Sequence, residues 1–155
     1  MAKTSSTKTG QGTGGKHPRG LRNNNPLNIR RGVSKWKGLR DFPTDKEFCE
    51  FESMDYGFRA AFITLRTYYT KHGCKTLRAI INRWAPPTEN DTTLYSYCVA
   101  VYAGIRDTDS VLPSPTDRQN ISLWADIMMG MAKVENGTNE GLVDACRRGI
   151  KIAFG

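Results

Sequence analysis

The chain has 155 residues, of which 38% are hydrophobic and 25% are charged, as expected for a soluble protein with one domain and a substantial core. No apolar run approaches the length of a membrane-spanning helix, so we expect no membrane span. The net charge of +8 indicates an anionic partner: nucleic acid, an acidic membrane surface or an anionic cell-wall polymer.

The first 19 residues are predicted to form a flexible basic tail, and residues 20–155 a single domain. The tail is rich in Gly, Ser, Thr and Lys and has almost no large apolar side chain, so it neither builds a core nor resembles a secretory signal. It is compatible with a solubilising leader and with an arm that holds an assembly or an anionic polymer.

Residues 27–52 are predicted to form a small two- or three-stranded antiparallel sheet. Leu27, Ile29 and Val33 indicate a first short strand, which follows a turn of three asparagines before Pro26. Partners are expected around Trp36, at Phe42 and over residues 47–51, where side chains should alternate: Glu47, Cys49 and Phe51 on one face, Phe48 and Glu50 on the other.

The rest of the chain is predicted to be helical, each helix having a capping residue or a buried stripe. Ser53 caps a helix that stops at Gly73 and buries Phe58, Phe62, Leu65 and Tyr69. Thr76 caps a second helix, whose inward residues are Leu77, Ile80, Ile81 and Trp84. After Pro86-Pro87, Asn90 or Asp91 caps a third, with Leu94, Cys98, Val101 and Tyr102 on its inner side. The last helix runs from about Asn139 to Ile152 and buries Leu142, Val143, Cys146 and Ile150.

A long apolar helix from Gln119 to Gly137 is predicted to end in a carboxylate. Steps of four, three, four and three residues place one set on a single helical face: Ile121, Ala125, Met128, Ala132 and Glu135. Asn136-Gly137 then stops the helix. Burial and the helix C-terminus would both raise the pKa of Glu135, as a general acid for glycosidic cleavage requires. The same spacing is compatible with a Glu135 side chain that turns into solvent at a frayed helix end.

Four cysteines are spread along the chain without a C-x-x-C pair: Cys49, Cys74, Cys98 and Cys146. Only His17 and His72 could assist them in holding a metal. We therefore expect reduced, mostly buried thiols, no metal site and no cofactor.

Four blocks of the sequence resemble a domain of phage and prophage virion proteins. They are Gly20-Leu-Arg-Asn-Asn-Asn-Pro-Leu-Asn-Ile-Arg30, Trp36-Lys-Gly38, Phe51-Glu-Ser-Met-Asp-Tyr-Gly57 with Arg59-Ala60, and Trp84-Ala-Pro-Pro-Thr-Glu-Asn-Asp-Thr92 with Tyr95. The resemblance covers roughly residues 19–153. More distantly, the same blocks resemble lysozyme-like peptidoglycan hydrolases of the lytic transglycosylase or glucosaminidase type. In those enzymes a helix ending in Glu-Ser-Gly precedes a loop like Asn-Asn-Pro-x-Asn-Ile.

This chain departs from that order, because it has no Asp or Glu before Asp41. Glu135-Asn136-Gly137 is similar to the missing Glu-Ser-Gly element but stands near the C-terminus. A circular permutation, which nearby chain termini make tolerable, would explain the difference. The resemblance thus implies a predominantly helical, lysozyme-like α+β fold with the small sheet near the N-terminus.

The resemblance also implies a site. Glu135 would protonate the bond between N-acetylmuramic acid and N-acetylglucosamine, and water or the sugar's own groups would resolve the oxocarbenium-like state. A second carboxylate is optional, and Glu50 and Glu52 are candidates, with Glu89 as a third. Solvated strand or helix positions account for these three acids equally well. Residues expected to line the cleft are Asn25, Asn28, Tyr56, Trp84 and Tyr95, although Trp84 and Tyr95 are also compatible with the core.

Two other classes of function stay open. The domain could be a non-catalytic virion structural or glycan-binding protein, in which Glu135 would be replaceable. Nucleic-acid binding has the tail and the charge in its favour, but the folded part lacks a helix-turn-helix, a zinc module or an aromatic RNA-binding motif. The favoured partners are therefore peptidoglycan glycan strands, with other virion proteins reached through the tail. The protein is expected in the virion, or in the host cytoplasm before release, and to act at the cell wall.

Overall fold

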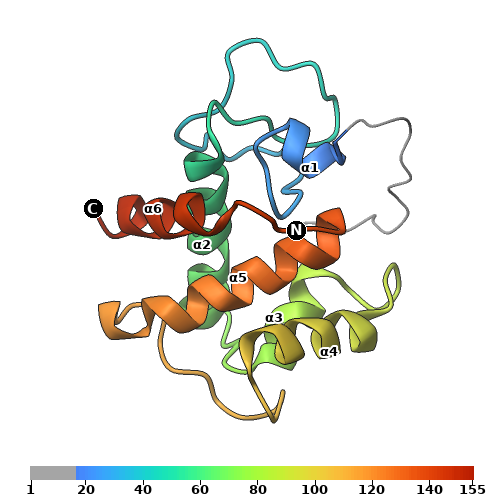
Figure 1. Ribbon diagram of the computed structural model, residues 1–155, viewed down its shortest axis with the longest axis vertical. Helices are drawn as coiled ribbons and strands as arrows, with labels where there is room; N and C mark the ends of the chain where they lie inside the picture. The colour runs from blue at the N-terminus through green and yellow to red at the C-terminus, as the bar shows by residue number, and fades with distance from the viewer. Residues whose placement is uncertain (1–16) are drawn as a thin grey trace.

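The computed structural model describes residues 17–155, so most of the predicted basic tail lies outside the described residues. The helices are, in chain order, α1 (Arg19–Arg22), α2 (Met54–Lys71), α3 (Leu77–Trp84), α4 (Thr92–Ala103), the short 3₁₀ helix η2 (Arg118–Asn120), α5 (Ile121–Asn136) and α6 (Val143–Phe154). α2 packs against α6, and α5 packs against both α4 and α6 (Figure 1). α1 also meets α5, which places the beginning of the described chain beside the end of that helix.

The predicted caps and most of the predicted core are confirmed. Ser53 accepts a hydrogen bond from the backbone N–H of Tyr56, Thr76 from that of Ala79, and Asp91 from that of Leu94. The inward residues predicted for α2 and α3 are all buried: Phe58, Phe62, Leu65, Tyr69, Leu77, Ile80, Ile81 and Trp84. These apolar side chains form one continuous core with those of α5 and α6.

The predicted α+β class with a small antiparallel sheet is wrong. Residues 17–155 contain no strand, and the segment expected to form the sheet has only two isolated bridges, Arg30 with Phe48 and Leu39 with Phe51. Asparagine side chains take the place of a strand ladder there, because the Asn25 amide bonds the backbone of Ile29 and Cys49. The expected alternation of faces is also absent, since residues 48–51 are all buried.

The predicted inner face of α4 is wrong as well. Leu94 and Val101 are 55% and 63% exposed, and Cys98 and Tyr102 are exposed too. The residues that α4 buries are Thr92, Tyr95, Ser96, Val99 and Ala100. Both sides of this helix are apolar, so that periodicity could not identify the buried side.

The last helix starts later than predicted. α6 begins at Val143 because residues 137–142 form a loop in which Gly137 and Gly141 adopt left-handed φ angles of 76° and 78°. Val143 is consequently 45% exposed, contrary to the prediction, whereas Cys146 and Ile150 are fully buried as expected.

Candidate functional site

Glu135 lies in the last turn of α5 and is 8% exposed. The predicted stripe leads to it, since Ala125, Met128 and Ala132 are almost completely buried. Gly137, in a left-handed conformation, ends the helix and donates its N–H to the Lys133 carbonyl at 2.8 Å. The carboxylate therefore stays inside the domain, and the alternative of a side chain turned into solvent does not hold.

Two side chains from distant segments hold the carboxylate. The Asn28 amide donates to Oε1 at 2.9 Å, and the Tyr95 hydroxyl donates to Oε2 at 2.8 Å. Asn28 follows α1, whereas Tyr95 lies on the inner side of α4. Folding thus brings together an amide from the start of the domain, a phenol from its middle and a carboxyl group from near its end.

Glu135 has a strongly perturbed pKa. The pKa of its carboxyl group is raised to about 7. Burial is the largest influence and raises the pKa, while the hydrogen bonds from Asn28 and Tyr95 and the nearby Trp84 indole oppose part of that rise. Burial together with the Glu135 charge raises the pKa of Tyr95 well above its usual range, so Tyr95 remains a phenol and a donor. At neutral pH the site therefore holds a carboxyl group that can give up or take up a proton.

The asparagine loop fixes Asn28 in place. Asn24 and Asn28 adopt left-handed φ angles of 52° and 55°, which asparagine tolerates better than most residues. The Asn136 amide, next to the acid, donates to the Pro26 carbonyl at 2.8 Å and to the Ala132 carbonyl at 3.0 Å. Asn136 thereby fastens the loop to the end of α5. Its role was not predicted, because the sequence marked Asn136-Gly137 only as a helix stop.

Several polar atoms at this site have no hydrogen-bond partner within residues 17–155. They are Oδ1 of Asn28, Oδ1 of Asn136 and Nε1 of Trp84, and all belong to buried residues. The Trp84 indole influences the pKa of Glu135, although its N–H forms no hydrogen bond of ordinary geometry. Oδ1 of Asn28 and Oδ1 of Asn136 face Gly20, where a Cβ would lie 3.0 Å from the first atom and closer still to the second, so both atoms are enclosed within the domain.

The other predicted cleft residues are placed differently. Asn25 is completely buried and bonds only backbone groups, so it shapes the loop. Trp84 is also completely buried and packs against Tyr68, with ring centroids 6.2 Å apart. Tyr56 is half-buried against Gly38, and Glu89 is exposed.

Glu50, one of the predicted second carboxylates, is held as an anion in a loop network. Its oxygens accept hydrogen bonds from Arg40 at 3.0 Å, from the Thr44 backbone at 2.6 Å and from the Asp45 backbone. Burial alone would raise the pKa of Glu50, but these hydrogen bonds outweigh it and the pKa is lowered. Glu50 is therefore already committed to closing its own loop.

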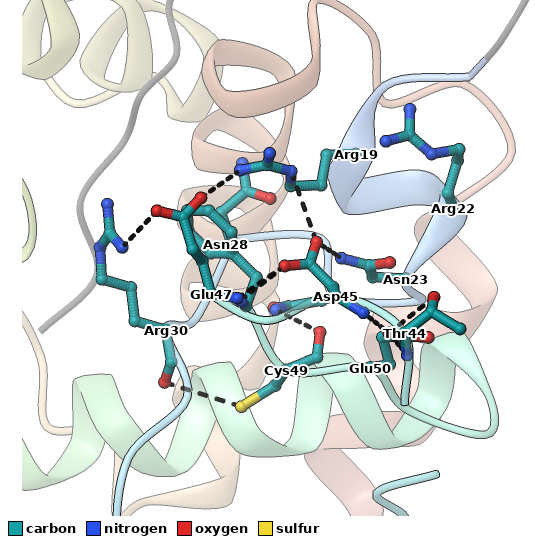
Figure 2. A network of polar contacts seen from close by, with 12 residues as sticks. Arg19, Arg22, Asn23, Asn28, Arg30, Thr44, Asp45, Glu47, Cys49 and Glu50 are labelled. Atoms are coloured by element: carbon teal, nitrogen blue, oxygen red, sulfur yellow. Dashed lines mark hydrogen bonds and ion pairs between the residues drawn. The ribbon is translucent and has the colours of Figure 1, made fainter. Parts of the chain in front are cut away.

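The same network continues toward the surface, where Arg19 lies 3.4 Å from Asp45 and Arg30 lies 3.9 Å from Glu47 (Figure 2). Glu52, the other predicted carboxylate, is exposed.

Metal-ligating side chains and cysteines are dispersed over residues 17–155. Within residues 17–155 no group of three or more metal-ligating side chains lies together. All four cysteines are free, with Cys98 exposed and the others buried. The same residues include no helix that is both long and apolar enough to cross a bilayer.

The protein is thus a small helical protein. Its candidate proton-transfer site is the buried Glu135 at the end of α5, which an amide and a phenol hold in place. No protein family model matches the chain. The chain is 37% identical to protein P5 of Pseudoalteromonas phage PM2 over 139 residues, which cover 88% of this chain and 82% of that protein. It belongs to the same family as this phage protein.

Proposed function

We propose that the protein is a phage virion component that cleaves the glycan strands of peptidoglycan, with Glu135 as the general acid. The observation that carries the proposal is the Glu135 carboxyl group, which is almost buried and whose pKa is raised to about 7. Cleavage of a glycosidic bond needs a carboxylic acid that is protonated near neutral pH but still acidic enough to release its proton. The membership of a phage protein family supports the setting.

In this mechanism Glu135 gives its proton to the glycosidic oxygen between N-acetylmuramic acid and N-acetylglucosamine. The leaving sugar departs as an oxocarbenium-like state develops, and water or the substrate's own hydroxyl or acetamido group completes the reaction. Asn28 and Tyr95 fix the orientation of the carboxyl group and stabilise the carboxylate left after proton transfer.

A second protein carboxylate is not needed if the substrate assists. Glu50 is unsuited to this role, because Arg40 and two backbone N–H groups occupy its oxygens. Glu52 is exposed and stays a candidate. The net charge of +8 favours approach to a wall that carries anionic polymers and muropeptide carboxylates.

The test is digestion of purified peptidoglycan by the wild type, Glu135→Gln and Glu140→Gln, with the products identified by mass spectrometry. Gln retains the shape of Glu135 but cannot donate the proton, whereas Glu140 lies exposed in the loop after α5. We expect Glu135→Gln alone to lose activity, and the product masses to distinguish hydrolysis from anhydro-sugar formation. Equal activity of all three proteins would remove Glu135 from the mechanism.

A non-catalytic role in the virion is the second candidate. One observation favours it: both oxygens of Glu135 already accept hydrogen bonds, so the acid also serves as a buried link between α4, α5 and the asparagine loop. Under that role none of the proteins would release muropeptides, and wall binding by Glu135→Gln would equal that of the wild type.

A further inference from the structure

The connection between α1 and α2 includes a projecting loop, residues 31–47, that carries two highly exposed apolar side chains. Val33 is 97% exposed and Phe42 is 90% exposed. Figure 1 shows this loop at the top of the view, at one end of the long axis and beyond the helices. The other large apolar side chains of residues 17–155 are less exposed than these two, and burial of the pair would remove apolar surface from water.

Cationic side chains surround these apolar residues. Arg31, Lys35, Lys37 and Lys46 are all exposed on the same loop. At the base of the loop Asp45 and Glu47 pair with Arg19 and Arg30, and Glu50 pairs with Arg40, although the Glu47 side chain is 60% exposed. Asp41, beside Phe42, and Glu47 are the exposed acids of the loop. The outer part of the loop therefore presents an apolar tip within a positive rim.

The loop also forms a groove. An open cavity of about 570 Å³ lies along the loop, and its lining residues include Arg31, Val33, Lys35, Leu39, Arg40 and Pro43, together with the acids Asp41 and Glu50. This lining combines apolar carbons with three cations and two acids, of which Glu50 is paired with Arg40. It suits a ligand that is itself amphipathic and anionic.

We propose that the 31–47 loop docks on an anionic phospholipid bilayer, with Val33 and Phe42 entering the interface and the lysines contacting lipid phosphates. Apolar residues that enter the acyl boundary, beside Lys and Arg that meet the headgroups, are the two components of interfacial membrane binding. A wall polymer or a nucleic acid would complement the charges but would leave Val33 and Phe42 in water. A second copy of the chain would bring two positive rims together. This membrane docking is independent of the glycan cleavage proposed above.

The experiment is co-sedimentation of the full chain with vesicles of phosphatidylglycerol and phosphatidylethanolamine, and with vesicles of phosphatidylcholine alone. The test protein is Val33→Ser/Phe42→Ser. Its matched control is Leu94→Ser/Val101→Ser, which alters two exposed apolar residues on α4, at the other end of the molecule (Figure 1).

Wild type and control should bind the anionic vesicles equally, and binding should weaken severalfold between 0.1 and 0.5 M salt. The loop variant should bind at least about tenfold more weakly, since it loses the burial of two apolar side chains. The basic N-terminal tail is unchanged in all three proteins, so a binding mode that depends on it alone would leave the loop variant equal to the wild type. The proposal would be overturned if the loop variant bound the vesicles as well as the wild type does. It would also be overturned if the wild type bound isolated cell walls and not vesicles.

Tryptophan fluorescence supplies a second readout. Trp84 and Trp124 are completely buried, whereas Trp36 is half-buried and lies on the loop. Vesicles that contain brominated phosphatidylglycerol should therefore quench the emission of Trp36, and Trp36→Phe should lose most of this quenching. Undiminished quenching in Trp36→Phe, or no quenching of the wild type once it has bound, would contradict insertion of the loop.

Discussion

Replacement of Glu135 by Gln should change how the stability of the protein depends on pH. In the folded protein the pKa of Glu135 is raised from 4.5 to about 7, so the folded state binds the proton more tightly than the unfolded chain does. The contribution of the protonated group to stability is fully present below pH 4.5 and is lost as the pH rises through 7. Each unit of pKa corresponds to about 1.4 kcal/mol, so the rise in the pKa of Glu135 contributes about 3 kcal/mol to the free energy of unfolding at low pH.

The Gln variant has no proton to lose at this position. Its amide can accept the hydrogen bond from Asn28 and donate to the Tyr95 oxygen, so the three side chains remain connected. Urea unfolding of both proteins at half-unit steps from pH 4 to pH 8.5 gives the difference in the free energy of unfolding. Contributions of Glu50, Asp45 and the other titrating groups cancel in this difference.

We expect the wild type to lose about 3 kcal/mol relative to Glu135→Gln between pH 4.5 and pH 8. Two stability curves that stay parallel over this range would refute the reasoning, because they would mean that Glu135 titrates alike in the folded and unfolded states.

Three further predictions concern positions around this site. Tyr95→Phe removes a donor to the carboxylate, so the pKa of Glu135 should rise above 7, and an NMR titration that finds it unchanged would contradict the assigned bond. Glu50→Ala leaves Arg40, which is 38% exposed, and two backbone donors without their acceptor and should cost about 1–3 kcal/mol by urea unfolding at pH 7, with a smaller cost at pH 3, since the lowered pKa of Glu50 stabilises the fold only while it is ionised. Gly149→Ala should lower stability by about 1–3 kcal/mol in thermal unfolding, because a Cβ there would lie 2.6 Å from the Asp55 carbonyl oxygen on α2, whereas Gly32→Ala, with open space around it, should change little.

The helical part of the fold was predictable from local pattern. Ser53, Thr76 and the pair Asn90-Asp91 marked three helix starts, of which the structure selects Asp91 for the third, since a polar cap followed by an apolar stripe is a short-range signal. The spacing of Ala125, Met128 and Ala132 predicted the buried face of α5, but it left open whether Glu135 at the end of that face turns into solvent. The buried face of α4 was not predictable. Apolar residues cover both sides of this helix, and only its packing against α5 selects the side that is buried.

The segment between α1 and α2 does not form the predicted sheet. Its β-like runs of apolar residues lie in irregular loops, because the side chains of Asn25 and Glu50 satisfy backbone groups that a sheet would otherwise pair. The partners of Glu135 were also only partly predictable. Asn28 and Tyr95 were expected near a sugar, but their contacts with the acid span 107 and 40 residues of sequence, and such long-range pairing has no local signal.

The most direct test of the account is the pKa of the Glu135 carboxyl group in the full chain, measured by carbon-detected NMR of glutamate-labelled protein. Comparison with Glu135→Gln identifies the resonance. The account predicts a pKa of about 7, so that a substantial fraction of the molecules carries a proton-donating acid at neutral pH. A value near 4.5 would show an ordinary carboxylate at the end of α5, and it would contradict the general-acid role.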